Sequence, residues 1–321
     1  MKKAISIIAL LLAVLCVFSG CSSSPKAYPD KNIDVTVLFT AGCSADLGLR
    51  KLTDIVEKTT DAKFVVNNRT GGGGSVGYQY ILNQSEDGYN ICWNSTSIST
   101  AYHNGNMPEG QDYTAFKAVC GLTIEPSIIA VSADSPYQTF EDFYNDAKAR
   151  PGEVKVLMGS IGSFDHLCAA NFAKAAGLDL NACHDNGSVV VPLLGNQVDV
   201  SMSIAAEFLP QIQAGSCRAL AVIAPERIAC LPDVPVLSEF NIDCDLTMYR
   251  GISVKAGTSD EAVKWLSEQF IAAAQTDEFK EYAKENGFEI LIQETEEFEK
   301  YTASVDAQIA DIMEELGLKA Q

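Results

Sequence analysis

The stretch from Asp34 to Glu57 has the pattern of a strand, a turn of small residues and then a helix. Apolar residues on one side of its first part predict an extended strand: Val35, Val37 and Phe39. After the turn Ala41-Gly42-Cys43, Ser44 is a suitable N-cap, and Asp46 places a carboxylate in the first helical turn. The N–H groups that begin a helix have no acceptor within it, so this unit favours an anion. A plain β–α connection is the alternative explanation.

A second unit of the same kind lies far along the chain. Val154 to Met158 is predicted to be a strand, and the small residues Gly159-Ser160-Ile161-Gly162 form the turn after it. Ser163 is then a suitable N-cap for a helix that ends at Gly177. Two such turns, each leading into a helix N-terminus, would suit a ligand that is held from two sides.

Polar residues also follow the predicted strand Tyr89 to Trp93, and they include Ser95, Thr96 and Ser97. In open α/β sheets, ligands lie beyond the carboxyl ends of the strands. We therefore expect these three side chains to face a ligand.

Strands and helices alternate along the whole chain, which predicts an α/β fold with largely parallel sheets. A chain of 321 residues is long enough for two domains or one large one. Two sheets of moderate size fit this length better than a single sheet.

The N-terminus has the pattern of a secretory signal. Lys2 and Lys3 precede a short apolar run from Ala4 to Phe18, and F-S-G-C resembles a bacterial lipoprotein cleavage box. We expect residues 1–20 to be the signal peptide, Cys21 to carry lipid and residues 21–27 to be a tether. The mature protein would then be extracytoplasmic and anchored to the cell membrane. A transmembrane anchor is the alternative, but the apolar run is short for one.

The composition argues against several partners. The formal net charge is −19, and no basic stripe is present to meet the phosphates of a nucleic acid. Apart from Cys16 and Cys21, none of the cysteines forms a C-x-x-C pair, so neither a zinc site nor an iron–sulfur site is expected. We expect no cofactor. Disulfides are possible in an exported chain, but the apolar surroundings of most cysteines favour free, buried thiols.

Nine segments in order resemble the substrate-binding proteins of the tripartite tricarboxylate transporter system, the TctC or Bug family. The resemblance runs from Tyr28 to about Gly317. The segments are YPDKNI at Tyr28, AGCSADLGLR at Ala41, NNRTGGGGSVG at Asn67, DGYNI at Asp87, GSIGSFDHL at Gly159, LLGNQVDV at Leu193, AGSCRALAV at Ala214, LPDVPVLSE at Leu231 and YRGISVKAGT at Tyr249.

The resemblance implies a type II periplasmic-binding-protein fold, in which two α/β lobes surround a ligand cleft and two crossing strands join them. The first lobe would hold residues 28–125 and 254–321, and the second residues 126–253. It also implies that a small carboxylate binds in the cleft and passes to membrane permease subunits. We expect a monomer.

The resemblance and the strand-end pattern together predict the ligand-binding residues. They are Ala41, Gly42, Ser44, Ala45 and Asp46 in the first loop, Gly159, Ser160, Gly162 and Ser163 in the second loop, Ser95, Thr96 and Ser97 at the third strand end, and Ser203 in V-D-V-S-M-S.

This chain departs from the family pattern at several of these positions. Cys43 stands where glycine is commoner, the second loop is shorter by about two residues, and Ser203 stands where relatives often carry Asp. The missing acid makes an amino-acid ligand less expected. Asp46 is expected to serve its own helix more than the ligand, because like charges repel. Arg250 is either part of a hinge ion pair, which we favour, or a cation that meets the ligand.

The leading functional prediction is a lipoprotein that binds a small carboxylate and delivers it to a permease. A ligand sensor that docks on a signalling protein would have the same sequence features. An exported hydrolase is the third class, for which His103, His166 and His184 are candidates. The absence of a G-x-S-x-G elbow and of a metal-spaced histidine pair argues against catalysis.

Overall fold

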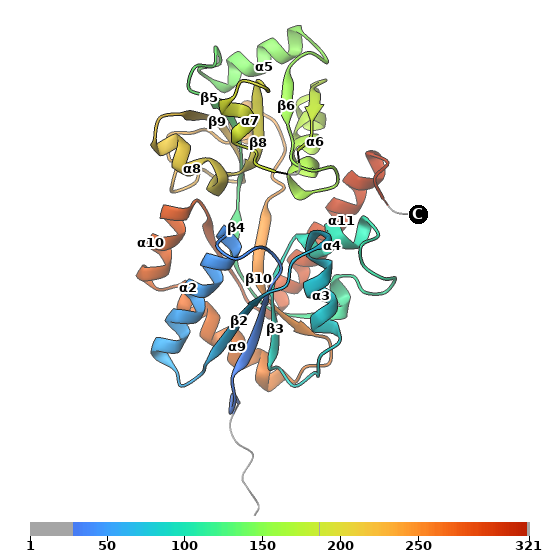
Figure 1. Ribbon diagram of the computed structural model, residues 1–321, viewed down its shortest axis with the longest axis vertical. Coiled ribbons are helices and arrows are strands. Elements are labelled where there is room, and N and C mark those ends of the chain that lie inside the picture. The colour runs from blue at the N-terminus through green and yellow to red at the C-terminus, as the bar shows by residue number, and fades with distance from the viewer. Residues whose placement is uncertain (1–27, 186, 320–321) are drawn as a thin grey trace, which may run out of the picture.

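The computed structural model describes residues 28–185 and 187–319. These residues form two α/β lobes that are stacked along the long axis of the molecule (Figure 1). The predicted signal peptide, the lipidation site Cys21 and the tether 21–27 lie outside the described residues. Within the part of the chain that is described, no helix has the length and apolar character needed to cross a membrane.

The first lobe is built on a six-stranded sheet in the order β11-β4-β10-β3-β1-β2. Its strands are β1 (Ile33–Val37), β2 (Phe64–Asn68), β3 (Asn90–Ser95), β4 (Phe116–Glu125), β10 (Met248–Lys255) and β11 (Glu289–Gln293). The helices of this lobe are α2 (Ser44–Thr59), α3 (Ser75–Leu82), α4 (Ser97–His103), α9 (Asp260–Ala274), α10 (Asp277–Asn286) and α11 (Thr295–Glu315). Apolar side chains of α2, α9 and α10 pack on one face of the sheet, and those of α3 and α4 pack on the other.

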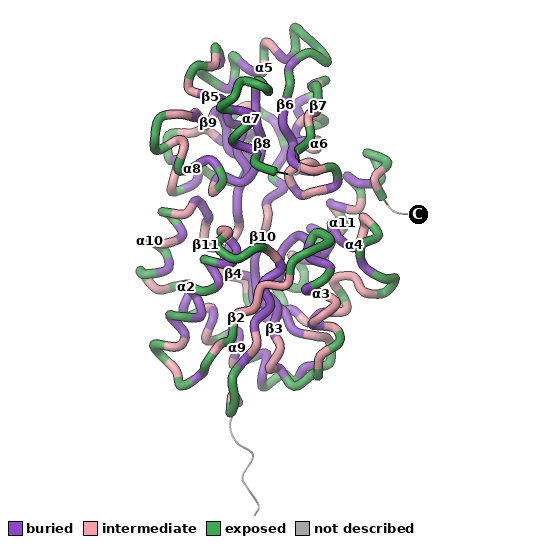
Figure 2. Tube along the Cα trace, in the orientation of Figure 1, coloured by how far each residue is buried: buried purple, intermediate pink, exposed green. Residues whose placement is uncertain are grey.

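The second lobe is built on a five-stranded sheet in the order β7-β6-β8-β5-β9. Its strands are β5 (Ser127–Ser132), β6 (Lys155–Leu157), β7 (Asn181–Cys183), β8 (Val200–Ile204) and β9 (Cys217–Ile223). Its helices are α5 (Phe140–Ala149), α6 (Phe164–Ala176), α7 (Val191–Leu194) and α8 (Ala205–Gln213). In Figure 2 the central strands of both lobes are buried along most of their length, whereas exposed residues lie mainly on helices and loops.

Both sheets are mixed, so the prediction of largely parallel sheets was wrong. The parallel pairs are β1–β2, β1–β3, β6–β7 and β6–β8, and the other pairs are antiparallel. The cause is the passage of the chain between lobes. In the first sheet, β10 returns from the second lobe and enters the sheet from the opposite end. It is therefore antiparallel to its neighbours β3 and β4.

The chain passes between the lobes through two β-segments, as the family resemblance implies. β4 leads through Pro126 directly into β5, and β10 brings the chain back. β10 pairs with β4 from Met248 to Lys255 and with β3 from Arg250 to Val254, so it lies inside the first sheet. The carboxyl ends of β1 and β3 therefore face the second lobe, and the amino end of β5 faces the first.

The last helix, α11, contributes to the cores of both lobes. Phe298 packs near its start, while Ile309, Ile312 and Met313 join the apolar cluster of the second lobe. Near the end of α11, Glu315 forms an ion pair with Lys174 of α6, with 2.6 Å between Nζ and Oε2. The C-terminal segment, predicted to belong to the first lobe, thus also lies against the second.

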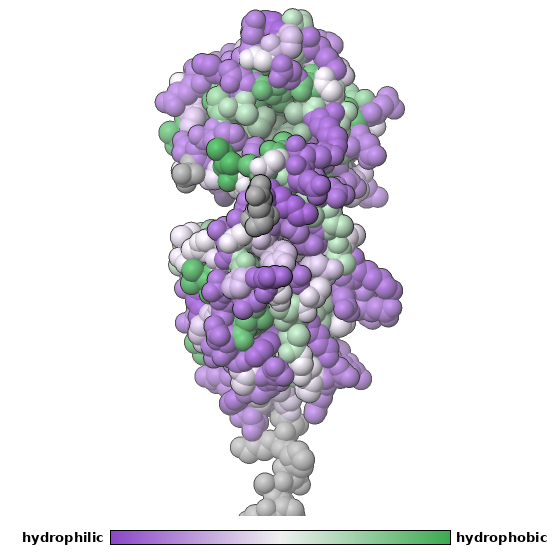
Figure 3. Space-filling model, turned by 90° about the vertical axis from the view of Figure 1, so that its right-hand side faces the viewer, coloured by the Kyte–Doolittle hydropathy of each residue, from purple (hydrophilic) through white to green (hydrophobic). Residues whose placement is uncertain are grey.

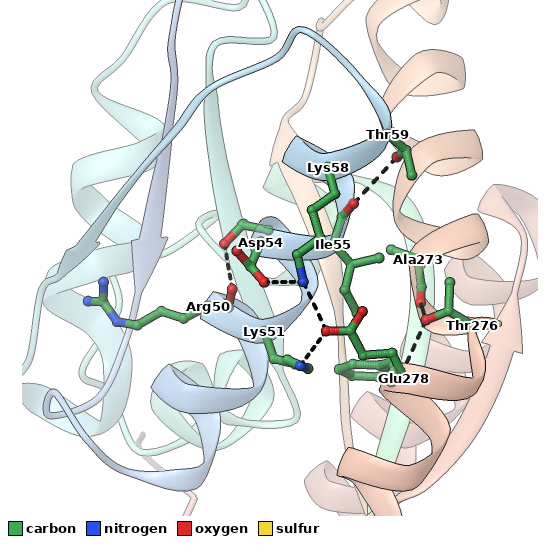
Figure 4. A network of polar contacts seen from close by, with 11 residues as sticks. Arg50, Lys51, Asp54, Ile55, Lys58, Thr59, Ala273, Thr276 and Glu278 are labelled. Atoms are coloured by element: carbon green, nitrogen blue, oxygen red, sulfur yellow. Dashed lines mark hydrogen bonds and ion pairs between the residues drawn. The ribbon is translucent and has the colours of Figure 1, made fainter.

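Ion pairs connect α2 with α10 (Figure 4). The Glu278 carboxylate accepts hydrogen bonds from Lys51 and Lys58 of α2 at 2.6 and 3.0 Å. Lys58 also meets Asp54 one turn earlier on the same helix, at 2.8 Å. These exposed pairs each contribute little stability, but together with the buried face of α2 they define how that helix lies on the sheet.

Gly251 of β10 is needed because the backbone comes very close to its neighbours. A Cβ atom at this position would lie 2.4 Å from the carbonyl oxygen of Cys120 and 2.4 Å from the Phe298 ring. Gly48 of α2 offers a contrast, because the nearest atom to a Cβ there would be in Phe288 at 3.8 Å, an ordinary contact distance.

We predict that Gly251→Ala destabilises the protein by about 1–3 kcal/mol, the usual cost of an overpacked core. Gly48→Ala is the matched control, and it should stabilise by about 0.5–1 kcal/mol because alanine favours a helix interior. Urea unfolding of both variants measures the free energies. A Gly251→Ala protein as stable as wild type would contradict the close packing of α11 on β10.

Candidate ligand-binding site

The first loop leads into α2 without a side-chain cap. The predicted N-cap, Ser44, is instead the first residue of the helix, and the N-cap is Cys43, whose side chain makes no capping hydrogen bond. The reason is the tight turn before it: Gly42 has a φ of +84°, and Cys43 is still extended. The backbone N–H groups of Ser44, Ala45 and Asp46 are therefore the uncapped amino end of α2.

Asp46 holds the first loop together through its carboxylate. One oxygen accepts the Gly42 N–H at 2.8 Å, and the other accepts from Asn68 Nδ2 and Arg50 Nε at 2.9 Å each. Burial acts to raise the pKa of the Asp46 carboxyl, but the hydrogen bonds from Arg50, Gly42 and Asn68 hold it below its usual value. Asp46 and the Gly42 N–H thus shape the loop, and the donors left at this position are those of the helix itself.

The second loop is capped, as predicted. Ser163 is the N-cap of α6, and its Oγ accepts the His166 N–H at 3.3 Å. The Gly162 N–H donates to His166 Nδ1 at 3.1 Å, so in the neutral ring the proton lies on Nε2. Burial, and next the neighbouring His184, lower the pKa of His166. Gly159 and Gly162 have φ values of +65° and +77°, which explains glycine at both positions of this turn.

The hydroxyls of Ser95, Thr96 and Ser97 are used inside the protein. Thr96 Oγ1 accepts the Tyr249 N–H at 2.9 Å, and the Ser95 and Ser97 hydroxyls lie 2.8 Å apart. Ser97 also meets the buried Tyr78 hydroxyl at 2.9 Å. These contacts join the end of β3 to β10 and the start of α4 to α3. The helix α4, which the sequence analysis did not predict, begins at Ser97. That the three side chains face a ligand stays a prediction.

Three acidic side chains surround Ser203 and the hinge. Ser203 is buried at the end of β8, and its hydroxyl lies against the carboxyl of Asp165 in the first turn of α6. Burial raises the pKa of Asp165 to about 7; the Ser203 hydroxyl opposes the shift, and Glu207 and Glu125 add to it. Burial, followed by Glu125, raises the pKa of Glu207 too. Sequence analysis overlooked Asp165, because an acid in a first helical turn has an ordinary explanation in the helix dipole.

Arg250 forms the hinge ion pair that the sequence analysis favoured. Its guanidinium is buried and binds both carboxylate oxygens of Glu125, with Nη2 2.8 Å from Oε2. The two residues lie on neighbouring strands at the point where the chain crosses between lobes. The Phe39 ring lies over the guanidinium, with its centroid 5.5 Å from Cζ.

The lobes also touch beside the crossing strands. Asn104 Nδ2, just after α4, donates to the Gly162 carbonyl of the second loop at 3.0 Å. Elsewhere, the Ala229 N–H of the second lobe donates to Glu289 of β11 at 2.6 Å. The outline of the molecule narrows between the two lobes in the space-filling view (Figure 3). The amino ends of α2 and α6, at the lobe edges that face each other, are thus brought to this junction.

The three histidines lie at two separate places in the structure. His103 of α4 lies 3.2 Å from Asp306 of α11, and the rings of His166 and His184 meet edge to face at the second loop. Within residues 28–185 and 187–319, no serine hydroxyl is hydrogen-bonded to a histidine ring nitrogen.

Comparison with known proteins decides the family. Residues 49–318 match the family model of TctC, the tripartite tricarboxylate transporter family receptor. The chain belongs to this family. The TctC match begins inside α2, so the first loop precedes it.

Relatives of this TctC chain cover nearly its whole length. Protein BugT of Bordetella pertussis is 26% identical over 320 residues, which are 96% of this chain and 98% of BugT. A TctC solute-binding protein from Polaromonas has a TM-score of 0.78 at 26% identity, covering 90% of this chain and 100% of that one. The structure of R. palustris Rpa4515 with adipate, at 22% identity, has the same fold, with a TM-score of 0.78 and coverage of 90% and 98%.

These comparisons confirm the type II two-lobed α/β fold and the TctC family. Members of this family are extracytoplasmic solute-binding receptors.

We predict that Asp165 makes the stability depend on pH between about 4 and 7. An unfolded aspartate ionises near pH 3.9, whereas the folded one stays protonated up to about pH 7. The folded state therefore binds the extra proton, and the free energy of unfolding falls as the pH rises through this window. Asp165→Asn removes that proton, so its stability relative to wild type should increase from pH 4 to pH 7.

Urea unfolding at several pH values measures this difference. Asp61→Asn, a change of the same chemistry at an exposed loop position, is the control, and its profile should run parallel to that of wild type. A parallel profile for Asp165→Asn as well would contradict the raised pKa of Asp165.

Proposed function

We propose that this TctC-family chain is an extracytoplasmic solute-binding lipoprotein. It captures a small carboxylate, a di- or tricarboxylate or a related organic acid, and delivers it to a tripartite tricarboxylate-type membrane permease. It acts as a monomer without catalysis, and the lipid on Cys21 holds it at the cell membrane through the tether 21–27.

The observation that carries the proposal is the uncapped amino end of α2. Cys43 gives this helix no side-chain acceptor, and the one carboxylate in its first turn, Asp46, is turned back to Gly42. The remaining N–H groups, at Ser44, Ala45 and Asp46, are oriented along the helix axis and carry the positive end of its dipole. A ligand carboxylate would supply the acceptor that the chain itself does not.

The second lobe supports the same proposal from the other side. The turn Gly159–Gly162 leads into the amino end of α6, and the Ser160 hydroxyl in this turn lies 3.4 Å from the Asp185 carbonyl oxygen. The Ser203 hydroxyl contacts the Asp165 carboxyl in the first turn of α6. In the proposal these residues contact the ligand once the lobes have closed. The fold relative Rpa4515 holds adipate, a dicarboxylate, which agrees with an acid as the ligand class.

A ligand panel tests the carboxylate class. We expect mono-, di- or tricarboxylates to raise the unfolding temperature of the protein from residue 22 onward, and sugars to leave it unchanged. A ligand present at 100 times its dissociation constant stabilises the folded state by about 2.7 kcal/mol, enough for a clear shift. Shifts with sugars or amines alone would contradict the proposal.

Ser44→Pro tests the role of α2. Proline is favourable at the first position of a helix and has no N–H, and Cys43 before it is extended, as a residue preceding proline should be. The variant should keep its fold but lose roughly ten- to a hundredfold in affinity for the best carboxylate of the panel, the value of a hydrogen bond to a charged group.

Asp260→Pro is the matched control for this variant. Asp260 is the first residue of α9, its N-cap Ser259 is also extended, and its side chain is exposed. The control should bind as wild type does. Equal affinity of Ser44→Pro and Asp260→Pro would rule out α2 as the carboxylate site.

A further inference from the structure

Arg250 has an unused hydrogen-bonding edge. The residue is only 4% exposed. Its Nε and Nη2 atoms bind Glu125, and Nη2 also lies 3.3 Å from the sulfur of Met248. Nη1 is buried and has no hydrogen-bond partner among the described residues. A guanidinium carries donors on each nitrogen, so two strong N–H donors point away from Glu125 with no acceptor.

A buried donor without an acceptor is costly, and the cost is larger when the group is charged. The Phe39 ring partly compensates, because a cation is attracted to the face of an aromatic ring. A ring face does not replace the oxygen acceptors that a guanidinium can bind, however. The position of Nη1 therefore needs a second explanation beyond the hinge ion pair.

The surroundings of Arg250 connect it to the ligand site. Arg250 stands opposite Ser95, at the carboxyl end of β3, in the register of the first sheet. Phe39 belongs to the loop that precedes α2, and Cys43, the N-cap of α2, is among the electrostatic neighbours of the guanidinium. The free edge of Arg250 and the uncapped amino end of α2 thus belong to the same corner of the first lobe.

The neighbouring acids explain why an anion needs a cation at this position. Glu125 carries a negative charge, and Asp165 and Glu207 from the second lobe are both influenced by it. A carboxylate ligand that enters between the lobes would be repelled by the Glu125 carboxylate if that charge were not paired. Arg250 balances Glu125 and offers two further N–H donors, so its free edge is the place where the repulsion is weakest.

We propose that Nη1 of Arg250 donates to the carboxylate that the amino end of α2 binds, and that Arg250 thereby selects organic acids over neutral solutes of the same shape. This inference rests on the proposed function. Arg250 would have two roles at once: one edge of the guanidinium holds the crossing strands through Glu125, and the other holds the ligand. The ligand class is a small acid with a carboxylate free to lie at the hinge.

Arg250→Lys is the decisive variant, because a lysine keeps the positive charge beside Glu125 but lacks the second, forked edge. We expect isothermal titration to show a ten- to hundredfold weaker affinity for succinate, citrate or adipate, whichever of these binds wild type. The preference for succinate over its neutral diamide, succinamide, should shrink by a similar factor if both bind. A purely structural role of Arg250 would leave that preference unchanged.

Two further variants make the result unambiguous. Arg218→Lys is the matched control, because Arg218 binds the backbone carbonyl of Tyr137 at 3.1 Å on the second lobe, and it should bind every acid as wild type does. If Arg250→Lys does not fold, the double variant Glu125→Gln with Arg250→Gln removes both buried charges together and avoids leaving one unpaired. The double variant should show the same loss of preference for the carboxylate.

The outcomes separate this inference from the proposed function. Wild type that binds none of the acids in the full carboxylate panel contradicts the proposed function, and the inference with it. Wild type that binds an acid while Arg250→Lys or the double variant binds it equally well contradicts the inference alone. Weaker binding and a smaller preference for the acid in the Arg250 variant, with unchanged binding by Arg218→Lys, support both.

Discussion

The structure depends on the antiparallel pairing of β4 with β10. These two strands carry the chain between the lobes, and they lie side by side in the middle of the first sheet from Phe116 to Glu125. Arg250 on one strand and Glu125 on the other place a buried ion pair where the crossing begins. Leaving one member of such a pair alone in the interior is costly, so the pair disfavours any arrangement in which the strands separate.

The N-termini of α2 and α6, near the lobe junction, differ in their capping: α6 has a side-chain cap and α2 has none. At α6 the Ser163 hydroxyl and the His166 ring accept backbone N–H groups, and the turn is complete in itself. At α2 the N-cap is a cysteine without a capping bond, and the Asp46 carboxylate serves the loop behind it. The asymmetry means that the first lobe has the unfilled acceptor position, whereas in the second lobe burial raises the pKa of Asp165 to about 7 and also raises the pKa of Glu207.

Helix caps were predicted correctly where the capping hydrogen bond joins residues within one helical turn of each other. Ser163 was correctly predicted as an N-cap because its partner is three residues away. Ser44 was not, since the turn at Gly42 shifts the start of the helix by one residue, and both Cys43 and Ser44 fit a cap by position alone. The helix α4 was missed, and the contact of Thr96 with β10 could not be predicted, because Tyr249 is far away in the sequence.

The sequence by itself determined the two strand–turn–helix units and the order of most elements, because hydrophobic periodicity, turn glycines and capping residues act between near neighbours. The two-lobed α/β class and the family followed from the resemblance of nine ordered segments to the TctC or Bug family. Only the tertiary structure decided the mixed direction of the sheets, the meeting of Asp165 with Ser203, and the pairing of Arg250 with Glu125, which are 125 residues apart. The physical reason is that desolvation and ion pairing depend on which distant groups the fold brings together, and no local pattern in the chain records that.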